Sequence, residues 1–181
     1  MANTANRFKS NEVHVPRVAK VRSENIPAEL KGLRQWVCWR WEKLDEKWTK
    51  PPVNARTGGS ASHSDPATWS TFAEALAAHQ KNSSRFHGIG FVFTENDPYA
   101  GVDLDDCRDP ETGQLDAWAL KIVRTLNSYC EVSPSGTGVK IFVKARLPEG
   151  APEGGVNDNE AGIEMYDKLR YFTTTGEIFN V

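Results

Sequence analysis

An apolar segment that ends in two carboxylates constrains this chain more than any other feature. Residues 100–106 read Ala-Gly-Val-Asp-Leu-Asp-Asp. Side chains alternate along a strand, so Asp103 and Asp105 share one face, with Val102 and Leu104 on the other. Two carboxylates on one face repel each other and need a compensating charge, which a pair of Mg²⁺ or Mn²⁺ ions can supply. The alternative is a pair of aspartates facing water at a strand end.

Short β-branched and aromatic runs alternate with two helical patterns. Strands are predicted at 35–41, 88–93, 99–105, 129–133, 139–144, 163–166 and 170–175. Helices are predicted at 66–80, with Asp65 as N-cap and Pro66 at the first helical position, and at 115–128. Polar segments predict a turn at 42–48, a loop at 49–62 and a mobile loop at 147–161. This order indicates an α+β fold, with a mostly antiparallel sheet and helices against one face.

The overall composition indicates one globular domain with a tail. The chain has 181 residues, 39% hydrophobic and 25% charged, and a net charge of −2. Residues 1–24 carry more basic than acidic groups and predict a flexible basic arm, or simply a solvated terminus, ahead of a core at 25–181. Three distant cysteines indicate reduced thiols and a cytoplasmic protein. We find no signal-peptide core and no stretch that predicts membrane association.

A glycine-rich turn between two predicted strands could bind phosphate. Residues 133–138 read Ser-Pro-Ser-Gly-Thr-Gly. The hydroxyls of Ser133 and Ser135 and the flexible backbone at Gly136 can direct donors at phosphate oxygens. Lys140, at the start of the next strand, could add a positive charge. An ordinary hairpin turn followed by an exposed lysine explains the same residues equally well.

Three further segments carry candidate groups. Glu164 is a charged residue in an otherwise apolar strand. It could be a third acidic metal ligand, or a charge on an edge strand that faces water. Arg170 could bind phosphate through two hydrogen bonds, and Tyr171 could pack on a sugar or base, although both fit a core strand. Lys50 and Arg56, in a loop stiffened by proline, could contact a nucleic-acid backbone, but a plain surface loop is the simpler interpretation.

Taken in order, these pieces resemble one family over roughly residues 26–180. The resemblance rests on Gln35–Trp39, Lys50–Pro52, Ser64–Trp69, Gly88–Val92, Val102–Asp105, Ser133–Gly138, and Glu164 with Arg170–Thr173. The chain resembles the archaeo-eukaryotic primase superfamily, in its phage and plasmid primase-polymerase branch. That resemblance implies a modified RRM-like core. It also implies template-directed synthesis from dNTPs or NTPs on single-stranded or primed DNA, with Mg²⁺ or Mn²⁺.

The resemblance also implies roles for individual residues. Asp103, Asp105 and Glu164 would be the metal ligands and catalytic carboxylates. The nucleotide-binding residues would be Ser133, Ser135, Gly136, Lys140, Arg170 and Tyr171, while Lys50 and Arg56 would guide nucleic acid. Many members have His where this chain has Lys140, which leaves a proton-transfer role in question. Members often continue into a helicase domain, so a longer parent protein is expected.

Other functions fit the same residues. A non-catalytic module could hold single strands or nucleotides within a replication complex. Two metals held by these carboxylates could instead hydrolyse phosphodiesters, as in a nuclease. A sensor of small nucleotides is a further alternative from outside replication.

Overall fold

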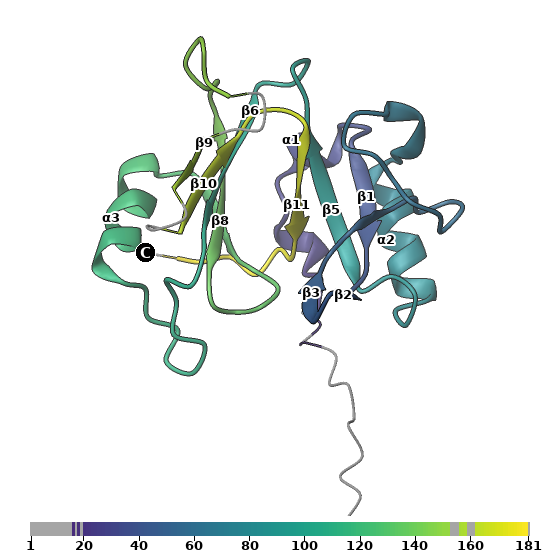
Figure 1. The fold of residues 1–181 in the computed structure, drawn as a ribbon, viewed down its shortest axis with the longest axis horizontal. Helices are drawn as coiled ribbons and strands as arrows, with labels where there is room; N and C mark the ends of the chain where they lie inside the picture. The colour runs from purple at the N-terminus through teal and green to yellow at the C-terminus, as the bar shows by residue number, and fades with distance from the viewer. Residues whose placement is uncertain (1–15, 17, 19, 153–155, 159–161, 181) are drawn as a thin grey trace, which may run out of the picture.

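Two antiparallel sheets, side by side, form the frame of the molecule (Figure 1). The computed structural model describes residues 16, 18, 20–152, 156–158 and 162–180. The first sheet has the order β11 (Arg170–Thr174), β5 (Gly88–Phe93), β1 (Trp36–Trp39), β4 (Pro52–Val53). The second has the order β7 (Tyr129–Val132), β8 (Val139–Lys144), β6 (Tyr99–Leu104), β10 (Ile163–Tyr166), β9 (Val156–Asp158). The predicted α+β class with mostly antiparallel strands is confirmed.

Short helices flank the two sheets. Helix α2 (Phe72–Lys81) packs on β1, and α3 (Ala117–Leu126) covers part of the second sheet (Figure 1). Helix α1 (Ala28–Lys31) is a single turn, and 3₁₀ turns occur at Ser23–Asn25 and Pro66–Thr68. No helix within the described ranges is both long and apolar enough to cross a membrane.

The division into two sheets departs from the single sheet expected from the sequence. Strands β5 and β6 follow each other in the chain yet lie in different sheets, as do β10 and β11. Strand β11 pairs with β5, whereas β10 pairs with β6 and β9. Both β5 and β6 are buried along their whole length. Such strands bury both faces, so their apolar pattern does not reveal which neighbour each one takes.

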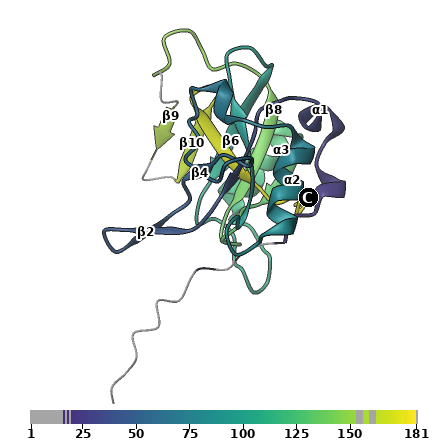
Figure 2. The same cartoon turned by 90° about the vertical axis from the view of Figure 1, so that its right-hand side faces the viewer.

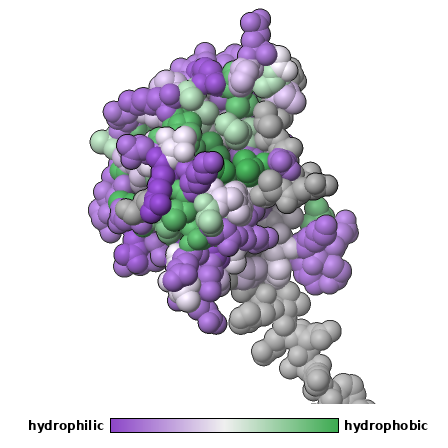
Figure 3. All heavy atoms as spheres, turned by 90° about the vertical axis from the view of Figure 1, so that its left-hand side faces the viewer, coloured by the Kyte–Doolittle hydropathy of each residue, from purple (hydrophilic) through white to green (hydrophobic). Residues whose placement is uncertain are grey.

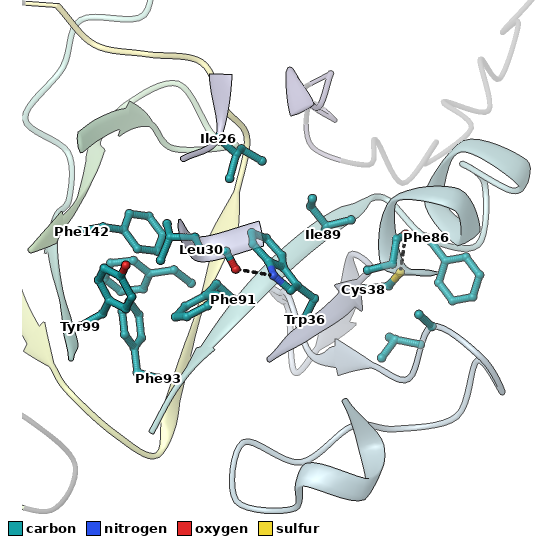
Figure 4. Packing of buried hydrophobic residues seen from close by; sticks show 14 of the residues in the cluster. Ile26, Leu30, Trp36, Cys38, Phe86, Ile89, Phe91, Phe93, Tyr99 and Phe142 are labelled. Atoms are coloured by element: carbon teal, nitrogen blue, oxygen red, sulfur yellow. Dashed lines mark hydrogen bonds between the residues drawn. The ribbon is translucent and has the colours of Figure 1, made fainter. Parts of the chain in front are cut away.

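The main core lies between the sheets and under α2. Trp36 is fully buried and meets Phe91 edge to face, with ring centroids 5.4 Å apart (Figure 4). It meets Phe72 of α2 in the same way at 4.9 Å. Its indole N–H donates to the carbonyl of Leu30 at 3.1 Å, so burial leaves this donor satisfied. Trp36 therefore belongs to the core, as does Trp39, rather than to an exposed stacking surface.

A second apolar cluster lies between α3 and the second sheet. It includes Cys107, Cys130 and Val123, and the partly buried Ile122 and Met165 pack against it. Seen from the side of α3, apolar side chains gather on the surface among polar ones (Figure 3). Cys38, Cys107 and Cys130 are all buried free thiols, as the sequence predicts. Burial raises the pKa of Cys107 to about 11, which keeps that thiol protonated.

Three predicted loops contain short strands. The segment predicted as a turn at 42–48 forms the hairpin of β2 (Glu42–Leu44) and β3 (Lys47–Thr49), which projects from the body (Figure 2). Its two-residue turn has positive φ at Asp45 and Glu46, the geometry that fits strand twist. The loop at 49–62 contributes β4, and the loop at 147–161 contributes β9. Strands β2 and β3 pair with each other, whereas β4 pairs with β1 and β9 with β10, partners that a polar composition conceals.

The helix predicted at 66–80 was wrong at its start. Asp65 caps only a 3₁₀ turn, accepting from the Ala67 N–H at 3.0 Å. Ser70 then extends to exchange two backbone hydrogen bonds with Trp36, and this pairing breaks the helix. The α-helix begins after Thr71, which forms a capping box with Glu74. The spacing of Thr71 and Glu74 was the signal for this start.

We expect Thr71→Ala to destabilise the protein by about 1 kcal/mol, because it removes the hydroxyl that accepts from the Glu74 backbone N–H at 3.2 Å and donates to the Glu74 carboxylate at 2.9 Å. Urea unfolding followed by circular dichroism measures the change. Thr125→Ala, on an exposed turn of α3, is the matched control and should be close to neutral. Equal midpoints for Thr71→Ala and wild type would show that the cap contributes nothing.

Most of the predicted N-terminal arm, residues 1–15, 17 and 19, lies outside the described residues, so this arm stays a prediction. Residues 22–25, at the end of that segment, are bonded to the segment that follows β11. The backbone N–H of Arg22 donates to Thr175 at 2.7 Å, and the Asn25 amide donates to the carbonyl of Gly176 at 2.9 Å. Residues 22–25 thus belong to the folded core.

Candidate metal and nucleotide site

Three carboxylates from neighbouring strands converge at one end of the second sheet. Asp103 lies on β6, Asp105 just beyond it, and Glu164 directly opposite Asp103 on β10. One oxygen atom from each of the three carboxylates lies within 4.8 Å of one oxygen from each of the others. Asp103 and Glu164 lie far apart in the chain and meet because β6 and β10 pair in this register. The strand alternation predicted Asp103 and Asp105, and the lone charge in an apolar strand suggested Glu164. The pairing shows that the three lie together.

These acids belong to a row of charged side chains that crosses four strands. Glu131 on β7, Lys140 on β8, Asp103 on β6 and Glu164 on β10 are direct cross-strand partners in sequence. Direct partners present their side chains on the same face. The row therefore alternates negative, positive and negative and then ends at Glu164, its third carboxylate.

Lys140 does not project into solvent, as an exposed hairpin lysine would. Its ammonium donates to Oδ2 of Asp103, and both side chains are about nine-tenths buried. The ammonium also lies 4.5 Å from the centre of the Phe172 ring. This pairing places a positive charge next to the cluster, although it engages only one of the two Asp103 oxygens.

The other Asp103 oxygen, Oδ1, is buried and has no hydrogen-bond partner. A buried oxygen without a donor costs free energy, so its presence points to a missing ligand. Burial and the charges of Asp103 and Glu164 raise the pKa of Asp105, against the opposing effect of Lys140. The hard oxygen donors, their crowding and the orphaned atom all fit a divalent cation such as Mg²⁺ or Mn²⁺.

A pocket of about 320 Å³ opens beside this cluster. Asp103 and Glu164 line it together with Arg170, Tyr171 and Phe172 of β11, and with Pro52 and His63. The two sheets thus contribute opposite walls, with acids on one and Arg170 on the other. The exposed Arg170 guanidinium lies 5.3 Å from the centre of the Tyr166 ring. Sequence reasoning missed His63, because an isolated histidine in a polar loop carries no pattern.

The serine-glycine turn is packed against the end of β6. The Thr137 hydroxyl donates to Asp106 at 3.1 Å, and Arg108 donates to the carbonyl of Gly136 at 2.8 Å. A Cβ on Gly138 would lie 2.4 Å from the carbonyl oxygen of Leu104, so only glycine permits this approach. The turn that contains Ser133, Ser135 and Gly136 therefore lies beside Asp105.

Within the turn, hydroxyls bond to one another. Ser133 and Ser135 are 2.9 Å apart at their hydroxyl oxygens, and the backbone N–H of Gly138 donates to Ser133 at 3.3 Å. Gly136 has φ of 84°, a conformation that favours glycine. The turn is thus preorganised, with Ser135 at its exposed surface.

Tyr171 and Lys50 are linked to each other. The Tyr171 hydroxyl donates to the carbonyl of Lys50, and burial raises the pKa of Tyr171. The Lys50 ammonium lies 4.8 Å from the centre of the Trp41 ring. Burial lowers the pKa of Lys50, and Lys140 lowers it further, whereas Asp103 and Asp105 raise it. Lys50 is therefore a neighbour of the acidic cluster rather than a lysine on a remote surface.

Arg56 is not among the residues that line the acidic pocket. This exposed side chain donates to the carbonyl of Ala67 at 2.8 Å, which joins two loops. The two predicted nucleic-acid contacts thus differ in position. Their roles stay predictions, as do those of the turn and of β11.

Comparison with known proteins gives this geometry a context. No family model matches the chain. The chain is 36% identical over 157 residues to the DNA primase-polymerase of Nitratiruptor phage NrS-1, a match that covers 86% of the chain. This similarity extends over most of the chain and supports a relation to phage-type primase-polymerases. This agrees with the archaeo-eukaryotic primase superfamily indicated by the motifs. The match covers 21% of the relative, so the chain spans about one fifth of that protein's length.

Proposed function

We propose that this chain is a catalytic core for template-directed nucleotidyl transfer in phage-type DNA replication. The observation that carries the proposal is the acidic cluster with its orphaned Asp103 oxygen, in a chain related to a DNA primase-polymerase. The substrates would be dNTPs or NTPs and a single-stranded or primed DNA template. A helicase partner is a further expectation that comes from the family alone.

In this proposal Asp103, Asp105 and Glu164 would hold two divalent cations, Mg²⁺ or Mn²⁺. Bound there, such cations would activate a 3′-hydroxyl and offset the charge of the triphosphate and the departing pyrophosphate. The pocket in front of the acids would then receive the triphosphate. The protein's own contribution is positioning and charge, since phosphoryl transfer needs little covalent work from side chains.

The remaining site residues would position the substrates. Arg170 faces the acids across the pocket and would contact phosphate oxygens. Ser133, Ser135 and Gly136, on the turn beside Asp105, would donate to the triphosphate. Tyr171 would shape the pocket through its ring, because its hydroxyl is already engaged by Lys50.

The lysines would assist in different ways. Lys140 would pair with Asp103 in the absence of the cations and contribute charge to the triphosphate once they bind. Its ammonium already lies at the acids. Lys50, and Arg56 from its exposed loop, would guide the template backbone.

A primer-extension assay tests the proposal. With Mn²⁺ or Mg²⁺, dNTPs and a primed template, the chain should lengthen the primer, and chelation by EDTA should stop it. Shortening of the strands would identify a nuclease instead. Strand binding without either reaction would indicate a non-catalytic module, and nucleotide binding without strand affinity a sensor. Separate reactions with rNTPs and with unprimed template would define sugar preference and priming.

A further inference from the structure

A second pocket, of about 450 Å³, lies next to the acidic pocket. His63 lines both, and the chain passes from Leu169 in one to Arg170 in the other. Buried aromatic side chains, Trp69 and Phe93, lie at its base, and exposed polar residues form its rim. None of the functions proposed above uses this cavity.

The walls of this pocket are held in place before any ligand arrives. Buried Asp97 accepts from the Gln35 amide at 2.7 Å and from the backbone N–H of Thr94 at 2.8 Å. Arg146 donates to the carbonyl of Glu95 at 2.9 Å. The Trp69 indole donates to Ser62 at 2.6 Å. A preformed cavity loses little conformational entropy when a ligand enters.

The opposite wall carries backbone strain. Leu169 has φ of 53°, a left-handed conformation that is rare for a branched side chain. Strained residues of this kind concentrate at ligand sites. Lys168 precedes Leu169 at the same wall, and Arg170 follows it. The turn therefore presents an apolar side chain between two positive charges.

The chemistry of the lining selects a flat, partly polar ring system. Leu169, Pro66 and the small exposed part of Trp69 offer apolar surface. Ser64, Asn96 and the side-chain carbonyl of Gln35 can form hydrogen bonds with ring edges. A nucleobase combines these properties, because its faces are apolar and its edges carry donors and acceptors. Lys168 and Arg170, on the turn beside this pocket, offer positive charge to the phosphates that flank such a base in a strand.

We propose that this pocket binds an unpaired base of the template strand, adjacent to the nucleotide at the acidic cluster. This inference rests on the proposed function, since it takes the strand to be a template. A base within a duplex is covered by its partner and by stacking, so only an extruded or single-stranded base can enter a concave site. The base of the incoming nucleotide is the other candidate occupant, and the titrations below distinguish the two.

Fluorescence of 2-aminopurine, placed at successive template positions, tests the inference. Titrations use the full chain with primed template, without free nucleotides, so that no extension occurs. We expect one position to report a distinct change on binding. The double variant Asn96→Ala/Leu169→Gly should lose that change and bind the strand about tenfold more weakly, the scale of one base contact.

Matched lysine variants provide a control for charge. Lys168→Ala should weaken the position-specific signal, whereas Lys81→Ala, at the exposed end of α2, should leave it unchanged. Circular dichroism verifies that each variant is folded. A uniform response at all positions, or an undiminished signal in the folded double variant, would overturn the inference.

Two further outcomes separate this inference from the proposed function. Primer extension without any position-specific signal would overturn the pocket assignment alone. A retained signal without extension would overturn nucleotidyl transfer and leave a strand-binding pocket. Titration with the triphosphate of 2-aminopurine deoxyriboside, without DNA, distinguishes the source of the base. A free nucleotide that fills this pocket while the strand does not would contradict the template assignment.

Discussion

Asp103→Asn should reduce primer extension by about 1,000-fold or more, a loss of several kcal/mol of transition-state stabilisation. Asparagine keeps an oxygen at the position of Asp103 but removes the charge that a divalent cation requires. Strand binding should change little, because the side chain lies in the acidic pocket rather than on a basic surface. Single-turnover extension with saturating Mn²⁺ measures the chemical step, and fluorescence anisotropy measures the binding.

The buried Lys140 complicates the use of this variant. Asp103→Asn leaves its ammonium without the charged partner seen in the structure, which can destabilise the fold. Asp105→Asn provides a second route, since Asp105 belongs to the same cluster without forming that ion pair. Asp116→Asn, an exposed aspartate before α3, serves as the control. Extension at the wild-type rate by a folded Asp103→Asn or Asp105→Asn protein would refute the metal assignment.

Replacement of Glu131 should produce the largest loss of stability. Glu131 is fully buried and accepts from the backbone N–H groups of Thr175 at 2.8 Å and Gly176 at 2.9 Å. It also accepts from the Tyr129 hydroxyl at 2.7 Å. Because β7 belongs to the second sheet and residues 175–176 follow β11 of the first, this carboxylate fastens the two sheets together. Other bonds share this junction, such as the Thr175 hydroxyl, which donates to the carbonyl of Val132 at 2.7 Å.

We expect Glu131→Ala to lower the free energy of unfolding by about 3–5 kcal/mol, because it leaves buried donors unsatisfied. Glu131→Gln should cost about 2 kcal/mol, since its amide keeps one acceptor oxygen. Urea unfolding at constant pH measures both, and Glu149→Gln, on an exposed loop, should be neutral. Wild-type stability in Glu131→Ala would show that the sheets are held together by other contacts.

The same residue predicts a pH dependence. Burial raises the pKa of Glu131 to about 7, in spite of its hydrogen bonds and nearby Lys140. A carboxyl group with a raised pKa binds its proton more tightly in the folded state. Its contribution is therefore complete below the ordinary value of about 4.5 and declines as the pH rises through about 7. The stability advantage of wild type over Glu131→Gln should shrink across that interval, and a constant difference would contradict the raised pKa.

The sequence by itself determined most of the local elements and indicated the family. Alternating apolar residues located the main strands, and the spacing at 115–128 located α3, because side-chain periodicity directly reflects backbone geometry. The same alternation put Asp103 and Asp105 on one face. The motifs, taken in order, were sufficient to indicate a primase-polymerase.

Only the tertiary structure decided how these pieces meet. Strands that follow each other in the chain separate into two sheets, and the pairing of β6 with β10 brings Glu164 opposite Asp103. Strand pairing also places Lys140 and Glu131 in one row with the acids. His63, from a polar loop, lines the acidic pocket. Register and sheet partners depend on contacts between distant residues, and local periodicity carries no information about them.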